Sequence, residues 1–98
     1  MAKFEVYELN GRQLVLDCQA DLLQHLDTRF VVPLLTMEEA PRPAARLNPV
    51  LKVQGIEMIM LTQQAAAVPA RLLGDPIASV SAQQNAVGNA LDMLICGF

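Results

Sequence analysis

The chain has 98 residues, which is enough for one domain, residues 1–98, with a modest hydrophobic core. Hydrophobic residues make up 53% of the chain and charged residues 17%, so few polar side chains remain to cover a small monomer, and we expect a homodimer with a buried isologous interface. The formal charge is -3 without a basic stripe, which argues against direct nucleic-acid binding and favours a protein partner.

The amino-terminal segment enters a strand pattern at once, with no apolar leader and no run long enough to span a membrane. We therefore expect a cytoplasmic protein without membrane contact. In that compartment the two cysteines, Cys18 and Cys96, are expected to be free thiols.

The first third of the chain predicts three strands. Residues 4–9 and 12–18 flank Asn10-Gly11, a pair that readily adopts the positive φ angles of a type I′ turn, so these segments form a β-hairpin. Residues 29–35 form the third strand. Pro33 lacks a backbone donor and is expected at a sheet edge or a bulge.

The middle of the chain predicts a loop followed by a second hairpin. Residues 37–46 have no usable periodicity and form the loop. Residues 50–53 and 56–62 pair around Gln54-Gly55, and apolar residues on both faces of the second strand place it in the interior of the sheet. Residues 63–67 are a connector of small residues, and residues 70–73 a further short strand.

The last element is an amphipathic helix. Ser81 and Gln84 have the spacing of a capping box at its start. One face is apolar and the opposite face holds the polar residues and Cys96, which should point to solvent or a partner. The apolar face consists of Val87, Leu91, Leu94, Ile95 and Phe98, and the other of Asn85, Asn89, Asp92 and Cys96. The elements together predict a mainly β domain of about five to seven short strands with a C-terminal α-helix.

Catalytic chemistry finds little support in these residues. The one histidine, His25, has no partner at metal-ligand spacing, so no metal site is expected. Phosphate-binding and serine-hydrolase motifs are absent from the sequence. Arg71 with Glu57 or Asp75 is an acid–base combination for a metal-free ribonuclease, but solvated charge is the more common role of such residues. We expect no enzyme activity and no cofactor.

Several segments, in their order and spacing, resemble plasmid-maintenance and chromosomal toxins of the CcdB type, which poison DNA gyrase. The segments are FEVY at 4–7, LDCQADLL at 16–23, RFVVPL at 29–34, LNPV at 47–50, AVP at 67–69 and NALDMLICGF at 89–98. The resemblance covers nearly the whole chain and implies an SH3-like small barrel of antiparallel sheets with one long terminal helix. It also implies a homodimer formed at and near that helix.

The resemblance further implies a toxin of a toxin–antitoxin system that binds the DNA gyrase A subunit and traps the cleaved DNA complex. The gyrase-binding residues would be Cys96, Gly97 and Phe98, where the family typically has Trp-Gly-Ile, so the tryptophan is missing here. Cysteine cannot supply the large buried area or the cation–π contact of a tryptophan.

The family's antitoxin is of the CcdA type, and through it the toxin meets DNA only indirectly, in a repressor complex that regulates transcription. The resemblance places antitoxin contacts at Leu22, Leu23, Asp92 and Ile95. Two alternatives remain open. One is a degenerate or retargeted toxin that binds antitoxin and acts only in operon autoregulation. The other is a metal-free endoribonuclease toxin, because messenger-RNA-cleaving relatives share this general fold.

Overall fold

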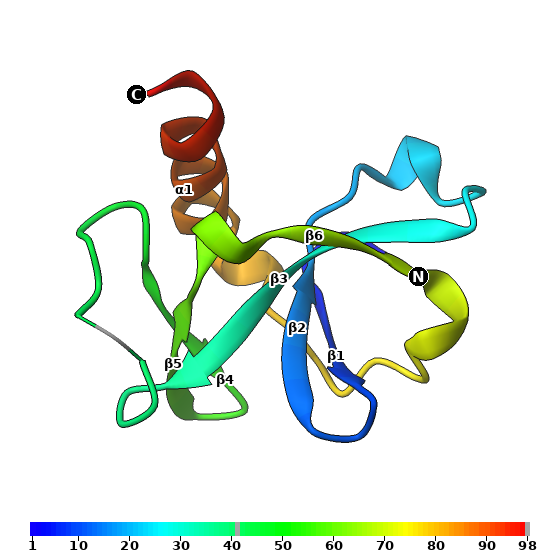
Figure 1. The fold of residues 1–98 in the computed structure, drawn as a ribbon, viewed down its shortest axis with the longest axis horizontal. Coiled ribbons are helices and arrows are strands. Elements are labelled where there is room, and N and C mark those ends of the chain that lie inside the picture. Colours follow the sequence, from blue (N-terminus) through cyan, green and yellow to red (C-terminus); the bar gives the residue numbers. More distant parts are fainter. Residues whose placement is uncertain (41, 98) are drawn as a thin grey trace.

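Antiparallel strands and one C-terminal helix make up the computed structural model, which describes residues 1–40 and 42–97 (Figure 1). The strands of this part of the chain are β1 (Glu5–Leu9), β2 (Gln13–Asp17), β3 (Thr28–Thr36), β4 (Val50–Val53), β5 (Ile56–Met60), β6 (Ala66–Pro69) and β7 (Ala78–Ser79). Short 3-10 turns are η1 (Asp21–Leu23), η2 (Thr62–Gln64), η3 (Ala70–Leu72) and η4 (Ser81–Gln83), and the helix is α1 (Gln84–Cys96). The predicted fold class is confirmed.

The sheet is nearly closed into a barrel. Its strand order is β4-β5-β3-β2-β1-β7, and β6 pairs with the first half of β3. The gap between the two outer strands is bridged by side chains. The Gln83 amide donates to Lys52 O and accepts from Lys52 N, both at 2.9 Å, and Gln54 donates to Ile77 O at 2.7 Å.

Both predicted hairpins are confirmed, and positive φ angles form both turns. Asn10 and Gly11 have φ of 56° and 69°, and Gln54 and Gly55 have φ of 52° and 82°. The second turn has two residues, whereas the first is one residue longer than predicted, because the paired part of β2 starts only at Gln13. Residues 37–40 and 42–46 are loop as predicted, and Pro41 lies outside the described residues.

The edge position predicted for Pro33 is wrong, because β3 is an interior strand. β3 pairs with β6 along Thr28–Val31 and with β5 along Leu34–Thr36. The Pro33 carbonyl accepts from Leu61 N at 2.9 Å, so its nitrogen faces the same side, where one partner strand ends and the next begins. The missing N–H therefore falls where no ladder bond is needed.

Three further local predictions are wrong. Residues 63–67 are not connector throughout, because Ala66 and Ala67 belong to β6 and pair with β3. Residues 70–73 form no strand, because Ala70–Leu72 closes a 3-10 turn and only Leu73 makes a single bridge, to Leu9. The capping box does not form either. Ser81 lies in the 3-10 turn η4, where its N–H donates to Ser79 Oγ at 3.3 Å, and α1 begins only at Gln84, without a side-chain cap.

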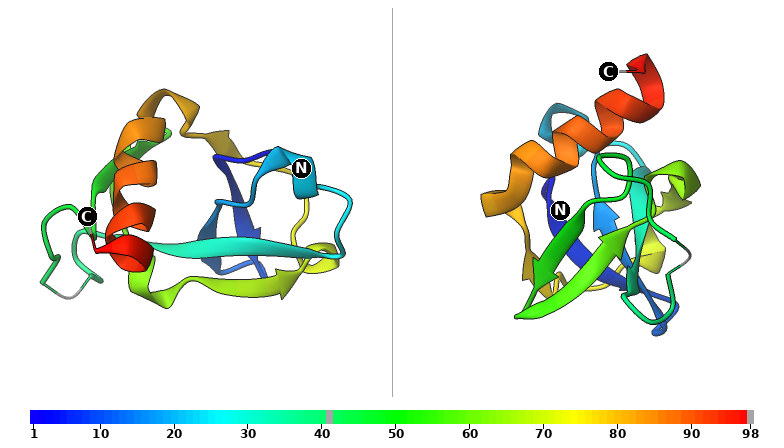
Figure 2. Two further views of the ribbon diagram at one scale, coloured as in Figure 1. Left: turned by 90° about the horizontal axis from the view of Figure 1, so that it is seen from above. Right: turned by 90° about the vertical axis from the view of Figure 1, so that its left-hand side faces the viewer.

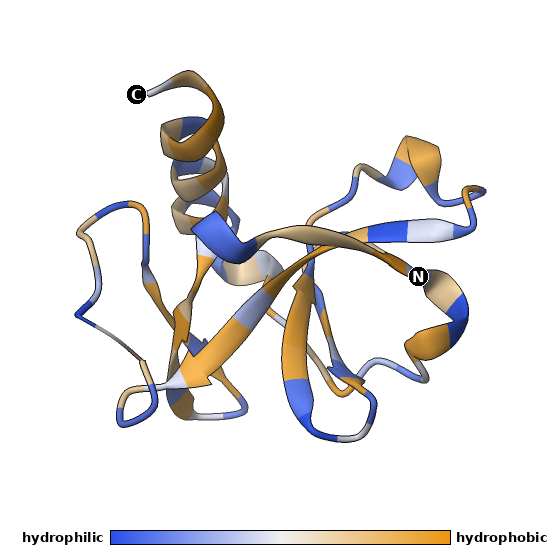
Figure 3. Ribbon diagram, in the orientation of Figure 1, coloured by the Kyte–Doolittle hydropathy of each residue, from blue (hydrophilic) through white to orange (hydrophobic). Residues whose placement is uncertain are grey.

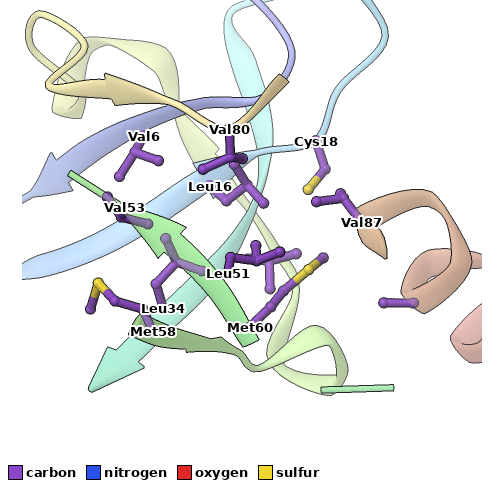
Figure 4. Packing of buried hydrophobic residues seen from close by; sticks show 12 residues of the cluster. Val6, Leu16, Cys18, Leu34, Leu51, Val53, Met58, Met60, Val80 and Val87 are labelled. Carbon is purple, nitrogen blue, oxygen red and sulfur yellow. The ribbon is translucent and has the colours of Figure 1, made fainter. Parts of the chain in front are cut away.

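The main core lies between the sheet and α1. Figure 4 shows Val87 from α1 close to Cys18, which follows β2, and Leu51 from β4 near Met60 from β5. Val87 and Ala90 are the buried residues of the helix, whereas Leu94 and Ile95 of the predicted apolar face are 40% and 72% exposed. The helix thus leaves the core after two turns, and its last turn projects away from the sheet (Figures 1 and 2).

A buried ion pair crosses from β2 to β3. Arg29 Nη2 lies 2.6 Å from Asp17 Oδ2, Arg29 Nε donates to the same oxygen at 2.8 Å, and both side chains are 0% exposed. A second small core consists of Tyr7, Val15, Val31 and Leu73, and Tyr7 is close enough to the ion pair to feel the charges of Asp17 and Arg29. Removing one ion therefore leaves the other charged in an apolar setting.

Arg29→Met should lower the free energy of unfolding by about 3 to 5 kcal/mol, because Asp17 then stays buried without its cation. Urea denaturation followed by circular dichroism measures the loss. The double variant Asp17→Leu with Arg29→Met removes both charges and should regain most of the stability. A double variant as unstable as the single one would contradict this account of the pair.

The two thiols should differ sharply in reactivity. Burial raises the pKa of the Cys18 thiol to about 12, so its nucleophilic thiolate is scarce at neutral pH, whereas Cys96 is exposed. A maleimide added to the folded protein at neutral pH should label one thiol, Cys96, and both in denaturant, as read by mass spectrometry. Cys96→Ser should abolish labelling of the folded chain, and rapid double labelling would show that Cys18 is accessible.

Candidate functional site

The helix end, residues 93–97, is an exposed apolar surface. Met93, Leu94 and Ile95 are exposed, as is the Cys96 thiol. Figure 3 shows this last turn in hydrophobic colours at a distance from the sheet. A surface of this kind is suited to burial against a protein partner.

Gly97 ends the helix. Its φ of 80° is left-handed, and its N–H donates to the carbonyls of Asp92 and Met93 at 3.2 and 3.1 Å. Glycine reaches this conformation without a steric penalty, so the chain turns off the helix axis here. Of the three gyrase-binding residues named from the sequence, Cys96 and Gly97 lie together, and Phe98 lies outside the described residues.

A second exposed apolar surface is the leucine loop, residues 20–27, which contains η1. Leu22 is 90% exposed, and Leu23 and Leu26 are also exposed. The loop joins β2 to β3, and sequence reasoning named Leu22 and Leu23 but missed Leu26. Apolar side chains at this level of exposure are typical of a binding surface.

The four antitoxin-binding residues named from the sequence do not form one patch. Leu22 and Leu23 lie in the leucine loop, and Asp92 and Ile95 lie in the last turns of α1. Two perpendicular views place these elements towards opposite ends of the long axis of the molecule (Figures 1 and 2). All four residues are exposed.

A hollow of about 480 Å³, the Arg71 pocket, opens between the start of β3 and η3. Its polar residues are Asp27, Thr28 and Arg71, and its apolar ones Leu26, Pro69 and Ala70. The pairing of Thr28 with Pro69 brings the two segments together. Sequence reasoning missed Asp27 because nothing in the spacing from 27 to 71 reveals this strand pairing.

The acid–base combinations named from the sequence are not assembled. Glu57 lines a different hollow, with Met37, Glu38 and Ile56, at the β4–β5 hairpin. In the described part of the chain, no ion pair joins Arg71 to Glu57 or Asp75. His25 is exposed in the leucine loop.

The titrating groups with shifted pKa values are buried in the fold. Burial raises the pKa of Tyr7, whose hydroxyl donates to Glu5 Oε1 at 2.7 Å. Burial also raises the pKa of Asp17, although the Gln19 N–H and Arg29 favour its charged form. Because Tyr7 and Asp17 have no exposed surface, they are placed to stabilise the fold rather than to meet a substrate.

Residues 1–40 and 42–97 contain neither a metal-binding cluster nor a helix able to span a membrane. No three or more His, Cys, Asp or Glu side chains gather there in a way that could hold a metal ion. None of the helices in this part of the chain is both long and apolar enough to cross a bilayer.

Solved structures with a fold similar to this one include two mycobacterial endoribonucleases and a mycobacterial toxin. An endoribonuclease from a mycobacterial species matches with a TM-score of 0.81 at 16% identity, over 98% of this chain and 91% of that one. A mycobacterial endoribonuclease in complex with its cognate antitoxin matches with a TM-score of 0.80 at 17% identity, over 98% and 95%. The Mycobacterium tuberculosis toxin MazF-mt6 matches with a TM-score of 0.70 at 16% identity, over 90% of each chain. At these identities the likeness establishes the fold alone.

The sequence itself matches a family model. The model described as CcdB protein matches residues 3–97 and therefore includes both the leucine loop and the helix end. The resemblance drawn from the sequence segments is confirmed, and this chain belongs to the CcdB protein family.

Proposed function

We propose that this chain is the toxin of a toxin–antitoxin pair and that it binds the DNA gyrase A subunit through the helix end, trapping the cleaved DNA complex. The observation that carries the proposal is an exposed apolar helix terminus, turned by Gly97, in a member of the CcdB family. Binding of this kind needs no catalytic group on the toxin.

The helix end has enough apolar surface to anchor a partner. Fully burying an aliphatic side chain contributes about 1.5 to 3 kcal/mol, and Leu94 and Ile95 are both available. Cys96 contributes less area than the tryptophan of the family pattern, so binding to gyrase should be weaker than a tryptophan at this position would give. The missing tryptophan is also the main support for the alternative, a degenerate or retargeted toxin that binds antitoxin and acts only in operon autoregulation.

We further propose that the toxin acts in the cytoplasm as a homodimer and that a CcdA-type antitoxin neutralises it. The antitoxin would contact Leu22, Leu23, Asp92 and Ile95, and it would be the route by which the toxin joins a DNA-bound repressor complex. One structural neighbour is itself in complex with a cognate antitoxin, which supports a partner of this class. Since the contact residues fall on two surfaces of a molecule 33 Å long, the antitoxin segment has to be extended or has to bridge two protomers.

A second candidate function is metal-free endoribonuclease activity. It is favoured by the fold of two similar solved structures, which are endoribonucleases, and by the Arg71 pocket. There Arg71 would stabilise the charge on a phosphate and Asp27 would move the proton.

The two functions separate in one experiment on purified gyrase and supercoiled plasmid. The wild-type chain should accumulate cleaved DNA, a variant lacking Gly97 and Phe98 should not, and Cys96→Trp should act at lower concentration because it buries more area. Arg71→Ala is the matched control and should behave as wild type. If the truncated chain stays toxic in cells while Arg71→Ala is harmless, the nuclease proposal gains and the gyrase proposal is wrong.

Leu22→Glu with Leu23→Glu should weaken binding to the antitoxin encoded in the same operon by at least about tenfold, which is 1.4 kcal/mol, because charge replaces buried apolar contact. Isothermal titration calorimetry measures the affinity. The control is Ile56→Glu, which changes an exposed apolar residue at the β4–β5 hairpin, away from both proposed surfaces. Unchanged affinity in the leucine variant would remove these residues from the antitoxin site.

A further inference from the structure

The leucine loop combines exposed apolar side chains with a tethered backbone. Leu22, Leu23 and Leu26 face solvent, yet successive turns order the chain beneath them. Leu23 N donates to Ala20 O at 2.9 Å, and Leu26 N donates to Leu23 O at 3.1 Å. Turns this short are only marginally stable by themselves, so further contacts have to hold the loop.

Gln19 supplies those contacts from inside the protein. Its side-chain Nε2 donates to Leu23 O at 2.9 Å, and its Oε1 accepts from Phe30 N at 3.0 Å. One buried amide thereby joins the middle of the leucine loop to the beginning of β3. Because the Leu23 carbonyl also accepts from Leu26 N, both of its lone pairs are used.

Gln19 is itself held by the buried ion pair. Its backbone N–H donates to Asp17 Oδ1 at 3.0 Å, while the other oxygen of Asp17 bonds Arg29. Arg29 directly precedes Phe30, the residue whose N–H the Gln19 side chain accepts. The ion pair and the Gln19 side chain therefore form one connected hydrogen-bonded unit that spans the end of β2, the leucine loop and β3.

A weaker contact holds the other side of the loop. Lys3 N donates to Asp21 Oδ1 at 2.8 Å, but this bond is exposed. An exposed bond competes with water and contributes less order than a buried one. Gln19, with only 8% of its surface exposed, is thus the principal side-chain anchor of the loop.

Rigidity matters here because of the cost of ordering on binding. Fixing the backbone of one residue costs about 1 to 2 kcal/mol, so a loop of several residues that were free in solution would lose much of its binding energy on docking. A loop already held in its bound shape avoids that loss. Three exposed leucines on a held loop are therefore arranged for binding by a protein partner.

We propose that Gln19 is a positioning residue that preorganises the leucine loop for its protein partner, an inference that rests on the proposed contact of Leu22 and Leu23 with the antitoxin. Gln19 does not touch the partner. It acts through the Leu23 carbonyl, and its removal should loosen the loop before it unfolds the sheet.

The test compares Gln19→Met, which keeps length and volume but lacks the amide, with Gln24→Met, an exposed residue of the same loop. Hydrogen exchange read by NMR should speed up at least about tenfold at the amides of Leu23 and Leu26 in the first variant only. The affinity for the antitoxin encoded in the same operon should fall by at least about tenfold in that variant and stay unchanged in the second.

A core variant separates positioning from general destabilisation. Val53→Ala lies in the main core and should lower global stability while leaving exchange in the leucine loop and antitoxin affinity as in wild type. Loop exchange unchanged by Gln19→Met, or faster exchange with wild-type affinity, would overturn the inference. If the wild-type chain binds no antitoxin, the proposed function fails, while the exchange measurement still decides whether Gln19 holds the loop.

Discussion

The buried Arg29–Asp17 ion pair is the contact on which the order of the leucine loop, at the junction of β2 and β3, depends. A buried guanidinium loses its hydration, and Arg29 Nη1 has no hydrogen-bond partner among the described residues, so the pair is a costly way to gain stability. Its geometry shows a contribution other than stability, namely that it positions neighbouring groups. It joins β2 to β3, lies near the small core around Tyr7, and leaves Asp17 Oδ1 free to hold Gln19. An apolar replacement could stabilise the strands but could not hold the loop.

Strand β3, which carries Arg29, connects the ion pair to the other strands of the sheet. Over its nine residues it pairs with β2 on one side and with β6 and then β5 on the other. The exchange of partners takes place at Pro33, the one residue of β3 that has no N–H to offer. The same strand begins beside the leucine loop and the Arg71 pocket and ends near the β4–β5 hairpin, so it joins these two candidate sites to the rest of the sheet.

Local chemistry predicted those elements that depend on nearby residues. Asn10, Gly11 and Gly55 readily adopt positive φ and therefore predict the two hairpin turns. The helical period of the apolar residues likewise predicts that Val87 faces the core. Prediction failed where distant contacts decide. Residues Ser81–Gln83 form the turn η4, in which Gln83 bonds Lys52 across the barrel gap, so Ser81 and Gln84 form no capping box. Ala66–Pro69 becomes a strand only because β3 offers an open edge. Asp27 and Arg71 come to line one pocket through the same pairing, which no spacing in the sequence reveals.

The separation of the two apolar surfaces has a consequence for how the proposed partners would share the toxin. Asp92 and Cys96 are four residues apart and lie on one face of α1, so an antitoxin bound at Asp92 and Ile95 would exclude gyrase from the helix end by direct overlap. An antitoxin segment on the leucine loop would leave the helix end accessible. Such a segment could anchor first on the preorganised loop, and the second contact would then form at a raised effective concentration and displace gyrase from the helix end. Under the proposed assignments, the preorganisation of the leucine loop by Gln19 thus affects the displacement of gyrase by the antitoxin as well as the affinity for the antitoxin.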